Sequence, residues 1–232
     1  MNMRNKLIFL ITILGLLAGC KDKKAEQFSA LPFPDVTVPS VYQDRQEIAE
    51  YLAEHWWDGL TDSQRSYPCD SSLVSGVKRG DVEQKFANWT QILHFSRRSV
   101  AEKSVARLYD MALACEKKDT SSNVFETFAS LVDKYLFDPN SPLRDEDLYG
   151  AYASRLAAYE GYTEVQKEKY ARDARLCALN KVGTRAADFR FADRRGKMRA
   201  LYGVEAPYTL LFFSNPGCEA CMSIINVLKE DP

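Results

Sequence analysis

Two cysteines near the C-terminal end of the sequence, Cys218 and Cys221, have the spacing of a redox pair. Cys218 opens a stretch with helical periodicity, so we expect its sulfur at a helix N-terminus, where unpaired N–H groups and the helix dipole stabilise an anion. The thiolate is the reactive form of cysteine, which makes Cys218 the predicted nucleophile. Cys221 follows one helical turn later and is the predicted resolving thiol. The pair predicts dithiol–disulfide exchange.

The elements that must position this pair are a strand, a turn and a helix. Residues 208–213 form a short apolar run without polar alternation, which predicts a strand buried on both faces, as in a parallel sheet. Asn215, Pro216 and Gly217 end the run, because proline lacks a donor and glycine relaxes the backbone. The helix that follows carries apolar residues at i, i+4 and i+7, namely Cys221, Ile225 and Leu228.

The residue beside the nucleophile, Glu219, bears on the direction of electron flow. A carboxylate next to the attacking sulfur disfavours its thiolate and so destabilises the reduced form of the pair. A destabilised reduced form makes the pair more reducing, and we therefore expect a reductant. The alternative is that Glu219 points into solvent and changes little.

A Cys-x-x-Cys pair is also half of many zinc sites, and an inert structural pair is a third interpretation. A zinc site would need two more ligands, and the candidates are scattered without a second paired spacing: Cys69, Cys115, Cys177, His55 and His94. We therefore expect no metal and no cofactor. The two histidines lie on apolar helical patterns and are predicted core or interface residues. Cys115 and Cys177 are either a disulfide or buried free thiols.

The stretch from Leu210 to Cys221, Leu-Leu-Phe-Phe-Ser-Asn-Pro-Gly-Cys-Glu-Ala-Cys, resembles the active-site strand and helix of thioredoxin-like proteins, in particular the membrane-anchored TlpA/ResA-type branch. Residues 182–189, Val-Gly-Thr-Arg-Ala-Ala-Asp-Phe, are similar to the segment that opens that domain, with Ala-Ala in place of the usual Ala-Pro. Residues 195–197 are similar to its first hairpin. The resemblance implies a thiol–disulfide oxidoreductase whose partners are protein disulfides or thiols and a redox partner protein.

The region before the α/β part carries a second resemblance. Residues 135–144, Tyr-Leu-Phe-Asp-Pro-Asn-Ser-Pro-Leu-Arg, look like part of the uncharacterised helical domain that precedes thioredoxin domains in Bacteroidetes lipoproteins. After Gly183 the sequence holds roughly half of a typical domain. The later strands, the last helices and the cis-proline loop of the thioredoxin-like family are not in it. We expect a truncated domain, or one whose sheet another chain completes.

The N-terminal residues resemble a lipoprotein signal. Arg4 and Lys6 precede an apolar run that is too short to span a bilayer, and Leu-Ala-Gly-Cys ends it at Cys20. We expect 1–19 to be a signal peptide, Cys20 to be lipidated, and 20–40 to be an extended tether. The acyl chains would hold the protein to the inner or outer membrane, facing the periplasm. The alternative is an ordinary secretory signal with a chance cysteine.

Residues 41–180 are predicted to be an antiparallel helical domain. Capping-box patterns begin at Asp81, Ser99 and Thr163. Residues 181–232 are predicted to form a partial thioredoxin-like domain, with strands at 187–192 and 197–201 before the active-site helix. The predicted class is α + α/β, a helical domain followed by the N-terminal half of a thioredoxin-like fold.

Composition excludes several function classes. The 232 residues are 46% apolar with a net charge of −1, so nothing favours nucleic-acid binding. The sequence has no Gly-rich phosphate loop, no His-Glu-x-x-His and no nucleophile elbow. Two interpretations remain. The first is a lipid-anchored periplasmic thiol–disulfide oxidoreductase, and the alternative is a non-catalytic, partner-binding lipoprotein with a vestigial thioredoxin-like domain.

Overall fold

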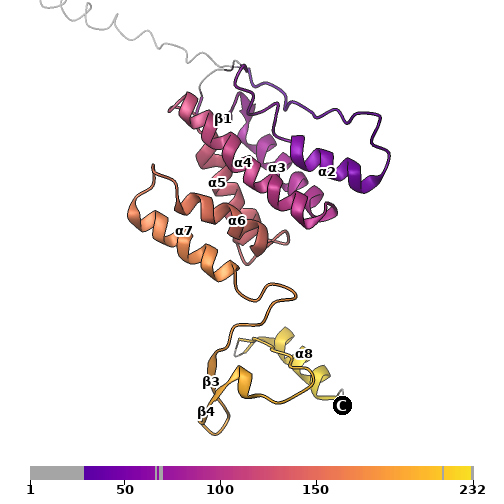
Figure 1. The fold of residues 1–232 in the computed structure, drawn as a ribbon, viewed down its shortest axis with the longest axis vertical. Helices are drawn as coiled ribbons and strands as arrows, with labels where there is room; N and C mark the ends of the chain where they lie inside the picture. The colour runs from indigo at the N-terminus through magenta and orange to yellow at the C-terminus, as the bar shows by residue number, and fades with distance from the viewer. Residues whose placement is uncertain (1–28, 66, 68–69, 216, 231–232) are drawn as a thin grey trace, which may run out of the picture. The chain divides into compact units, whose positions relative to one another are not determined.

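The computed structural model describes residues 29–65, 67, 70–215 and 217–230. The predicted signal peptide and the lipidation site Cys20 lie outside the described residues, as do Cys69 and Pro216. Contacts within the chain separate two units, with the boundary between Ala178 and Leu179. The first is helical and the second is α/β, so the predicted α + α/β class is confirmed (Figure 1). In the described residues no helix is both long enough and apolar enough to cross a membrane.

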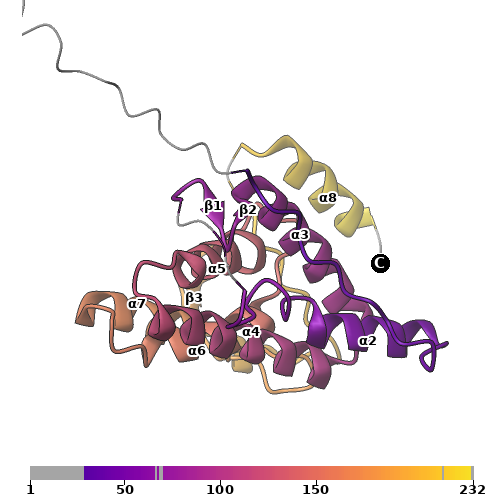
Figure 2. The same cartoon turned by 90° about the horizontal axis from the view of Figure 1, so that it is seen from above.

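In the helical unit, helices that are close in sequence pack side by side (Figures 1 and 2). Helix α2 packs against α3 and α4, α4 against α5 and α6, and α6 against α7. After α5 the chain continues through a π-helical turn at Asp133–Phe137. The helices run over the following residues: α2 Arg45–His55, α3 Arg79–Phe95, α4 Arg98–Lys118, α5 Val124–Val132, α6 Glu146–Ala157 and α7 Glu164–Cys177.

A two-stranded hairpin precedes α3 and was not predicted. Strands β1 (Leu73–Val74) and β2 (Val77–Lys78) pair antiparallel across a turn made by Ser75 and Gly76. Both turn residues have positive φ, +46° at Ser75 and +77° at Gly76. Two-residue hairpin turns of this kind favour Asn-Gly or Gly-Gly, so a serine at the first position gives only a weak sequence signal.

Aromatic side chains fill the core of the helical unit. Trp57 lies edge-on to Phe128 at 4.7 Å and contacts Phe86 at 6.0 Å and Trp89 at 5.9 Å between ring centroids. All four side chains are buried, and the indole N–H of Trp89 donates to the carbonyl of Ala53. Each such ring removes a large apolar area from water, which is the main stabilising term here. Trp57 therefore serves packing in this unit.

The first residues of the helices show which of the predicted capping boxes are present. Thr163 and Gln166 form the predicted capping box at α7. The patterns at Asp81 and Ser99 are wrong as caps, because α3 begins at Arg79 and α4 at Arg98. The hairpin leads directly into α3, since Lys78 ends β2 and is also the residue before the helix. At α4 the start is fixed by Arg97, whose backbone and guanidinium both donate to Glu50 of α2.

The described part of the predicted tether is not a free spacer, which corrects that prediction. The N–H of Leu31 donates to the carbonyl of Gly76 at 2.8 Å, and Phe33 lies edge-on to Trp57 at 5.7 Å. Asp35 pairs with Lys85 of α3 at 2.8 Å. Pro34 lies so close to Gly59 that a Cβ added there would come within 2.7 Å of the proline Cβ. Residues 31–35, here called the docked segment, therefore belong to the helical unit.

The prediction for the two histidines of the helical unit is corrected, and the open alternative for Cys115 and Cys177 is resolved. His55 and His94 are not core residues, because their side chains are 39% and 40% exposed and face Asp58 and Asp145. Cys115 and Cys177 do not form a disulfide. Cys177 is buried and Cys115 is half-buried, which matches the alternative of free thiols.

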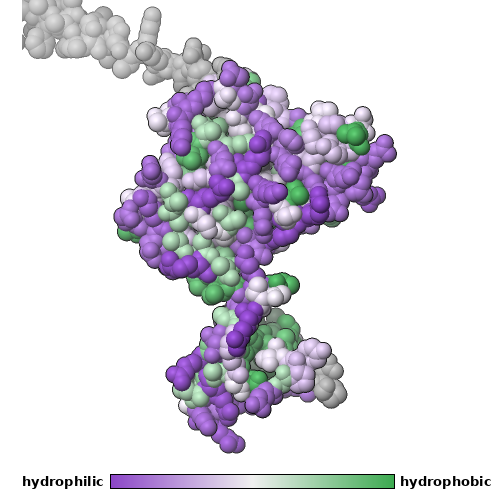
Figure 3. All heavy atoms as spheres, in the orientation of Figure 1, coloured by the Kyte–Doolittle hydropathy of each residue, from purple (hydrophilic) through white to green (hydrophobic). Residues whose placement is uncertain are grey.

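The α/β unit contains a short hairpin and one helix. Strands β3 (Arg190–Ala192) and β4 (Met198–Ala200) pair antiparallel, shorter than predicted, around a turn that has Gly196 at φ +74°. A 3-10 turn follows at Leu201–Gly203, and α8 spans Glu219–Glu230. Figure 3 shows apolar side chains on the surface of this unit.

The predicted buried strand at 208–213 is wrong in this structure. The segment is not a strand, and Tyr208 is 94% and Phe213 80% exposed. A strand needs a neighbour to pair its backbone and bury its faces. In the described residues the α/β unit pairs only β3 with β4, so the apolar run lacks such a neighbour.

Candidate functional site

Cys218 is the residue directly before α8, the helix whose first residue is Glu219. Its N–H donates to the carbonyl of Asn215 at 3.3 Å, and its own carbonyl accepts from the N–H of Met222 at 3.0 Å. Gly217 precedes it with φ +80°, a conformation that a side chain disfavours. The turn therefore presents Cys218 at the end of the helix where N–H groups are unpaired. Pro216 of the predicted turn lies outside the described residues.

The two thiols of the motif are brought together as the spacing predicts. The backbone N–H of Cys221 donates to Sγ of Cys218 at 3.3 Å. Both cysteines are half-buried free thiols. A hydrogen bond to sulfur stabilises the thiolate more than the thiol, since the anion is the stronger acceptor.

The pKa values of the two thiols are shifted in opposite directions. Hydrogen bonds from the thiol and the N–H of Cys221, joined by the N–H of Ala220, lower the pKa of Cys218. The shared hydrogen bond with Cys218 and burial raise the pKa of Cys221. One sulfur is thus favoured as the attacking thiolate and the other as a thiol that is activated later. The N–H of Ala220 is a contributor that the spacing of cysteines alone does not reveal.

Glu219, which the sequence placed beside the sulfur, is exposed to solvent. The groups that act on the Cys218 sulfur are the thiol of Cys221 and the N–H groups of the first helical turn. Water screens charges on exposed side chains. The geometry therefore favours the alternative in which Glu219 has a small effect.

The other two described thiols differ from the pair in their surroundings. Burial raises the pKa of Cys115, and burial with the nearby Glu146 carboxylate raises the pKa of Cys177 to about 11. A thiol with a raised pKa holds little thiolate at neutral pH and reacts slowly. Within the described residues no group of three or more His, Cys, Asp or Glu side chains is arranged to hold a metal ion.

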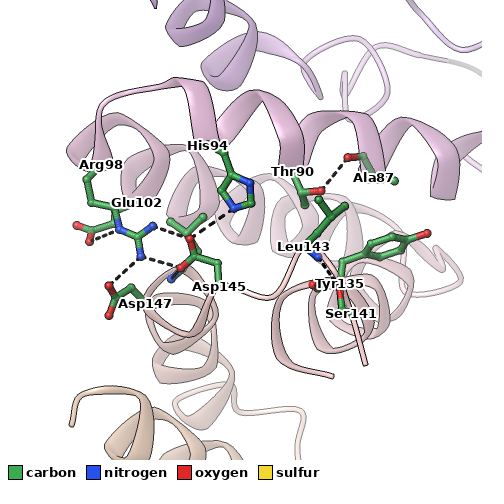
Figure 4. A network of polar contacts seen from close by, with 11 residues as sticks. Ala87, Thr90, His94, Arg98, Glu102, Tyr135, Ser141, Leu143, Asp145 and Asp147 are labelled. Carbon is green, nitrogen blue, oxygen red and sulfur yellow. Dashed lines mark hydrogen bonds and ion pairs between the residues drawn. The ribbon is translucent and has the colours of Figure 1, made fainter. Parts of the chain in front are cut away.

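A polar network in the helical unit was not anticipated from the sequence (Figure 4). The guanidinium of Arg98 donates to both carboxylate oxygens of Asp145, at 2.6 and 2.7 Å, and lies 3.0 Å from Asp147. Nε2 of His94 lies 3.7 Å from Asp145, and Glu102 lies 3.6 Å from Arg98. Asp145 also accepts from the N–H of Leu148 and so caps α6. The network ties α3, α4 and α6 together.

Comparison with known protein families assigns the larger part of the chain to one family. The model of a family described as a domain of unknown function, DUF5106, matches residues 18–180. The chain belongs to this family. The DUF5106 match covers the docked segment and the helices up to α7, and it ends at residue 180, before the first strand of the α/β unit.

A solved structure aligns with most of the chain. It is a thioredoxin-like protein from Bacteroides caccae ATCC 43185, which is 29% identical and aligns with a TM-score of 0.70. The alignment covers 88% of this chain and 69% of that chain. The thioredoxin-like resemblance inferred from the residues around Cys218 is thus supported at the level of the fold. A search of curated proteins finds no match.

Proposed function

We propose that this DUF5106 chain is a thiol–disulfide oxidoreductase that acts through Cys218 and Cys221. The observation that carries the proposal is the 3.3 Å hydrogen bond from the N–H of Cys221 to Sγ of Cys218 at the start of α8. The lowered pKa of Cys218 and the raised pKa of Cys221 support different roles for the two sulfurs. The thioredoxin-like structural neighbour supports the same chemistry.

The reaction is a pair of thiol–disulfide exchanges. The Cys218 thiolate attacks one sulfur of a disulfide in a client protein, and the other client sulfur leaves as a thiolate that takes up a proton. The mixed disulfide is resolved when Cys221 loses its proton and attacks Sγ of Cys218, which releases the second client thiol. Two electrons pass from the cysteine pair to the client. A redox partner protein with its own dithiol returns the pair to the reduced state.

The direction of transfer is set by the reduction potential of the pair. We propose reduction of the client as the direction, and the Glu219 carboxylate beside Cys218 gives this direction a small electrostatic contribution. Its side chain is exposed, so its influence on the sulfur is weakened by water. Hydrogen bonds that stabilise the Cys218 thiolate act in the opposite sense, because they favour the reduced form.

The proposed place of action is the cell envelope, on the periplasmic side. Support comes from the sequence, in which a positive segment and a short apolar run precede Leu-Ala-Gly-Cys20. Lipid on Cys20 would hold the protein to the inner or outer membrane. Protein disulfides form in this oxidising compartment and are available there as clients.

A trapping experiment tests the proposal. A Cys221→Ser variant cannot resolve the mixed disulfide, so we expect it to accumulate disulfide-linked adducts through Cys218 with envelope proteins. Cys218→Ser should abolish the adducts, and Cys177→Ser is the matched control that should leave them unchanged because that thiol is buried. Absence of adducts in the Cys221→Ser variant would favour the alternative, a non-catalytic lipoprotein that binds a partner.

A further inference from the structure

The β3–β4 hairpin of the α/β unit concentrates positive charge (Figure 1). Residues 189–204 hold five basic residues and one acidic residue, whereas the whole chain has a net charge of −1. The acidic residue is Asp193, and the basic residues are Arg190, Arg194, Arg195, Lys197 and Arg199. A local excess of one sign on a nearly neutral chain favours contact with a partner of the opposite charge.

Asp193 is committed to the turn of the hairpin. Its Oδ1 accepts the backbone N–H groups of Arg195 and Lys197 at 2.9 and 3.0 Å, and its Oδ2 pairs with the guanidinium of Arg199 at 3.0 Å. The hydrogen bond from Arg199, followed by the two backbone hydrogen bonds, holds the pKa of Asp193 below its usual value. This carboxylate therefore stays charged and offsets the charge of Arg199.

The other four cations of the hairpin, Arg190, Arg194, Arg195 and Lys197, are exposed. Among the described residues none of their side chains makes a hydrogen bond or an ion pair. Arg190 begins β3, Arg194 and Arg195 lie in the turn, and Lys197 directly precedes β4. Four like charges so close together repel one another, and the repulsion is relieved where they meet anions.

An apolar side chain accompanies the cations beside the turn. Met198 is 56% exposed and lies opposite Ala192 in the register of the two strands, so both side chains are on one face of the hairpin. Ala192 is small and leaves Met198 free to contact another molecule. Several cations next to an exposed apolar side chain suit the surface of an anionic bilayer, where headgroups attract the charges and the acyl boundary accepts the apolar group.

We propose that the β3–β4 hairpin docks onto anionic phospholipid headgroups. The four exposed cations contact the phosphate oxygens, and Met198 enters the boundary between headgroups and acyl chains. The inference rests on the envelope location proposed above, because a lipid on Cys20 keeps a bilayer within reach and makes its headgroups the anions of highest effective concentration. It does not depend on thiol exchange.

The test is cosedimentation of the purified protein with phospholipid vesicles. The protein is the mature form that begins at residue 20, with Cys20→Ser so that no acyl chain contributes. Vesicles of phosphatidylcholine alone are compared with an equimolar mixture of phosphatidylcholine and phosphatidylglycerol. The protein should bind the anionic vesicles and not the neutral ones, and binding should weaken as salt is added because salt screens the charges.

Variants of the hairpin make the test specific. Arg194→Gln, Arg195→Gln and Lys197→Gln combined should lower the vesicle partition coefficient roughly 100-fold, since each cation near an anionic bilayer contributes a factor of about five. The double variant Arg194→Lys with Arg195→Lys keeps the charge and should keep the binding. Met198→Ser should weaken binding without changing its dependence on salt.

A matched control removes the same charge from the helical unit. Arg45→Gln, Lys103→Gln and Lys117→Gln combined change three exposed cations that make no ion pair among the described residues. This variant should bind anionic vesicles nearly as well as the unmodified protein, because its substitutions lie outside the hairpin. The comparison separates the hairpin from the net charge of the chain.

Four results would overturn the proposal. The first is equal binding to neutral and anionic vesicles at low salt, and the second is an unchanged partition coefficient in the triple hairpin variant. The third is an equal loss in the control, which would make net charge the cause. The fourth is binding to polyglutamate but not to vesicles, which would assign the hairpin to an acidic protein. None of these results bears on the thiol exchange, because the assay involves no disulfide chemistry.

Discussion

The backbone N–H of Cys221 donates to Sγ of Cys218 across 3.3 Å, so the predicted resolving residue stabilises the thiolate of the predicted nucleophile. The thiol of Cys221 adds a further hydrogen bond, which is the largest cause of the lowered pKa of Cys218. Under the proposed mechanism, Cys221 therefore has two tasks: it first stabilises the Cys218 thiolate and then displaces the client. The spacing of the pair brings the two residues together in the first turn of α8.

Replacing Cys221 should make Cys218 a weaker nucleophile. In Cys221→Ala the thiol donor is lost while the backbone N–H remains, so the pKa of Cys218 should rise towards the ordinary value of about 8.5. A rise of one unit lowers the thiolate fraction at neutral pH about tenfold. The check is the pH profile of alkylation in a chain in which Cys20, Cys69, Cys115 and Cys177 are also replaced. Cys221→Ser keeps a hydroxyl donor and should give a smaller rise, and identical profiles would contradict the expectation.

The charge of Glu219 should have a small effect on the reduction potential. Glu219→His replaces a group that opposes the thiolate by one that favours it, so the potential should become less negative. Because the side chain is exposed, the change should not exceed roughly 20 mV. Equilibration with glutathione measures the potential, and Glu219→Gln separates loss of the negative charge from gain of a positive one. An unchanged or more negative potential in Glu219→His would remove the reason for expecting a reductant.

The docked segment should contribute to the stability of the helical unit. Phe33→Ala removes a half-buried ring from Trp57 and should lower the free energy of unfolding by about 1–3 kcal/mol. Pro32→Ala, at an exposed neighbouring position, is the matched control and should change little. Urea unfolding followed by tryptophan fluorescence measures both. Equal stability of the two variants would show that residues 31–35 do not hold the unit together.

Asp145 should make the fold sensitive to acid. Burial alone would raise its pKa, but hydrogen bonds from Arg98 and from the N–H of Leu148 outweigh this, and the pKa is lower than usual. A lowered pKa in the folded chain means that the carboxylate form favours folding. This contribution is complete above the unfolded pKa of about 3.9 and is lost as the pH falls through the lower folded value.

Two replacements separate the charge of Asp145 from its cap. Asp145→Asn keeps an N-cap but removes the charge, so unfolding curves should show less loss of stability below about pH 4. Asp145→Ala also removes the cap and should be about 1 kcal/mol less stable than Asp145→Asn at neutral pH. If the acid limb of Asp145→Asn matched that of the unmodified chain, another carboxylate would have to explain it.

Local signals were the part of the fold that the sequence could predict. The capping box at Thr163 and Gln166 needs only residues three apart, and it is present at α7. The helix that starts after Cys218 is also local, because its turn glycine and its apolar spacing lie within one stretch. The α + α/β class follows from the same local patterns.

Features that depend on distant partners could not be predicted. Phe33 docks because Trp57 lies beneath it, and the start of α4 follows from Glu50 of another helix. The apolar run at 208–213 carries the composition of a buried strand, but pairing decides whether a strand forms. The hairpin at Ser75 was missed because its strands are two residues long and its turn lacks the usual residues.

The docked segment limits how far the protein can reach. If Cys20 carries lipid as proposed, Leu31 is the first of the described residues that bonds to the helical unit, and a fully extended backbone from Cys20 to Leu31 would measure at most about 40 Å. The helical unit would then stay within that distance of the lipid headgroups. Clients would be drawn from proteins that approach the bilayer surface.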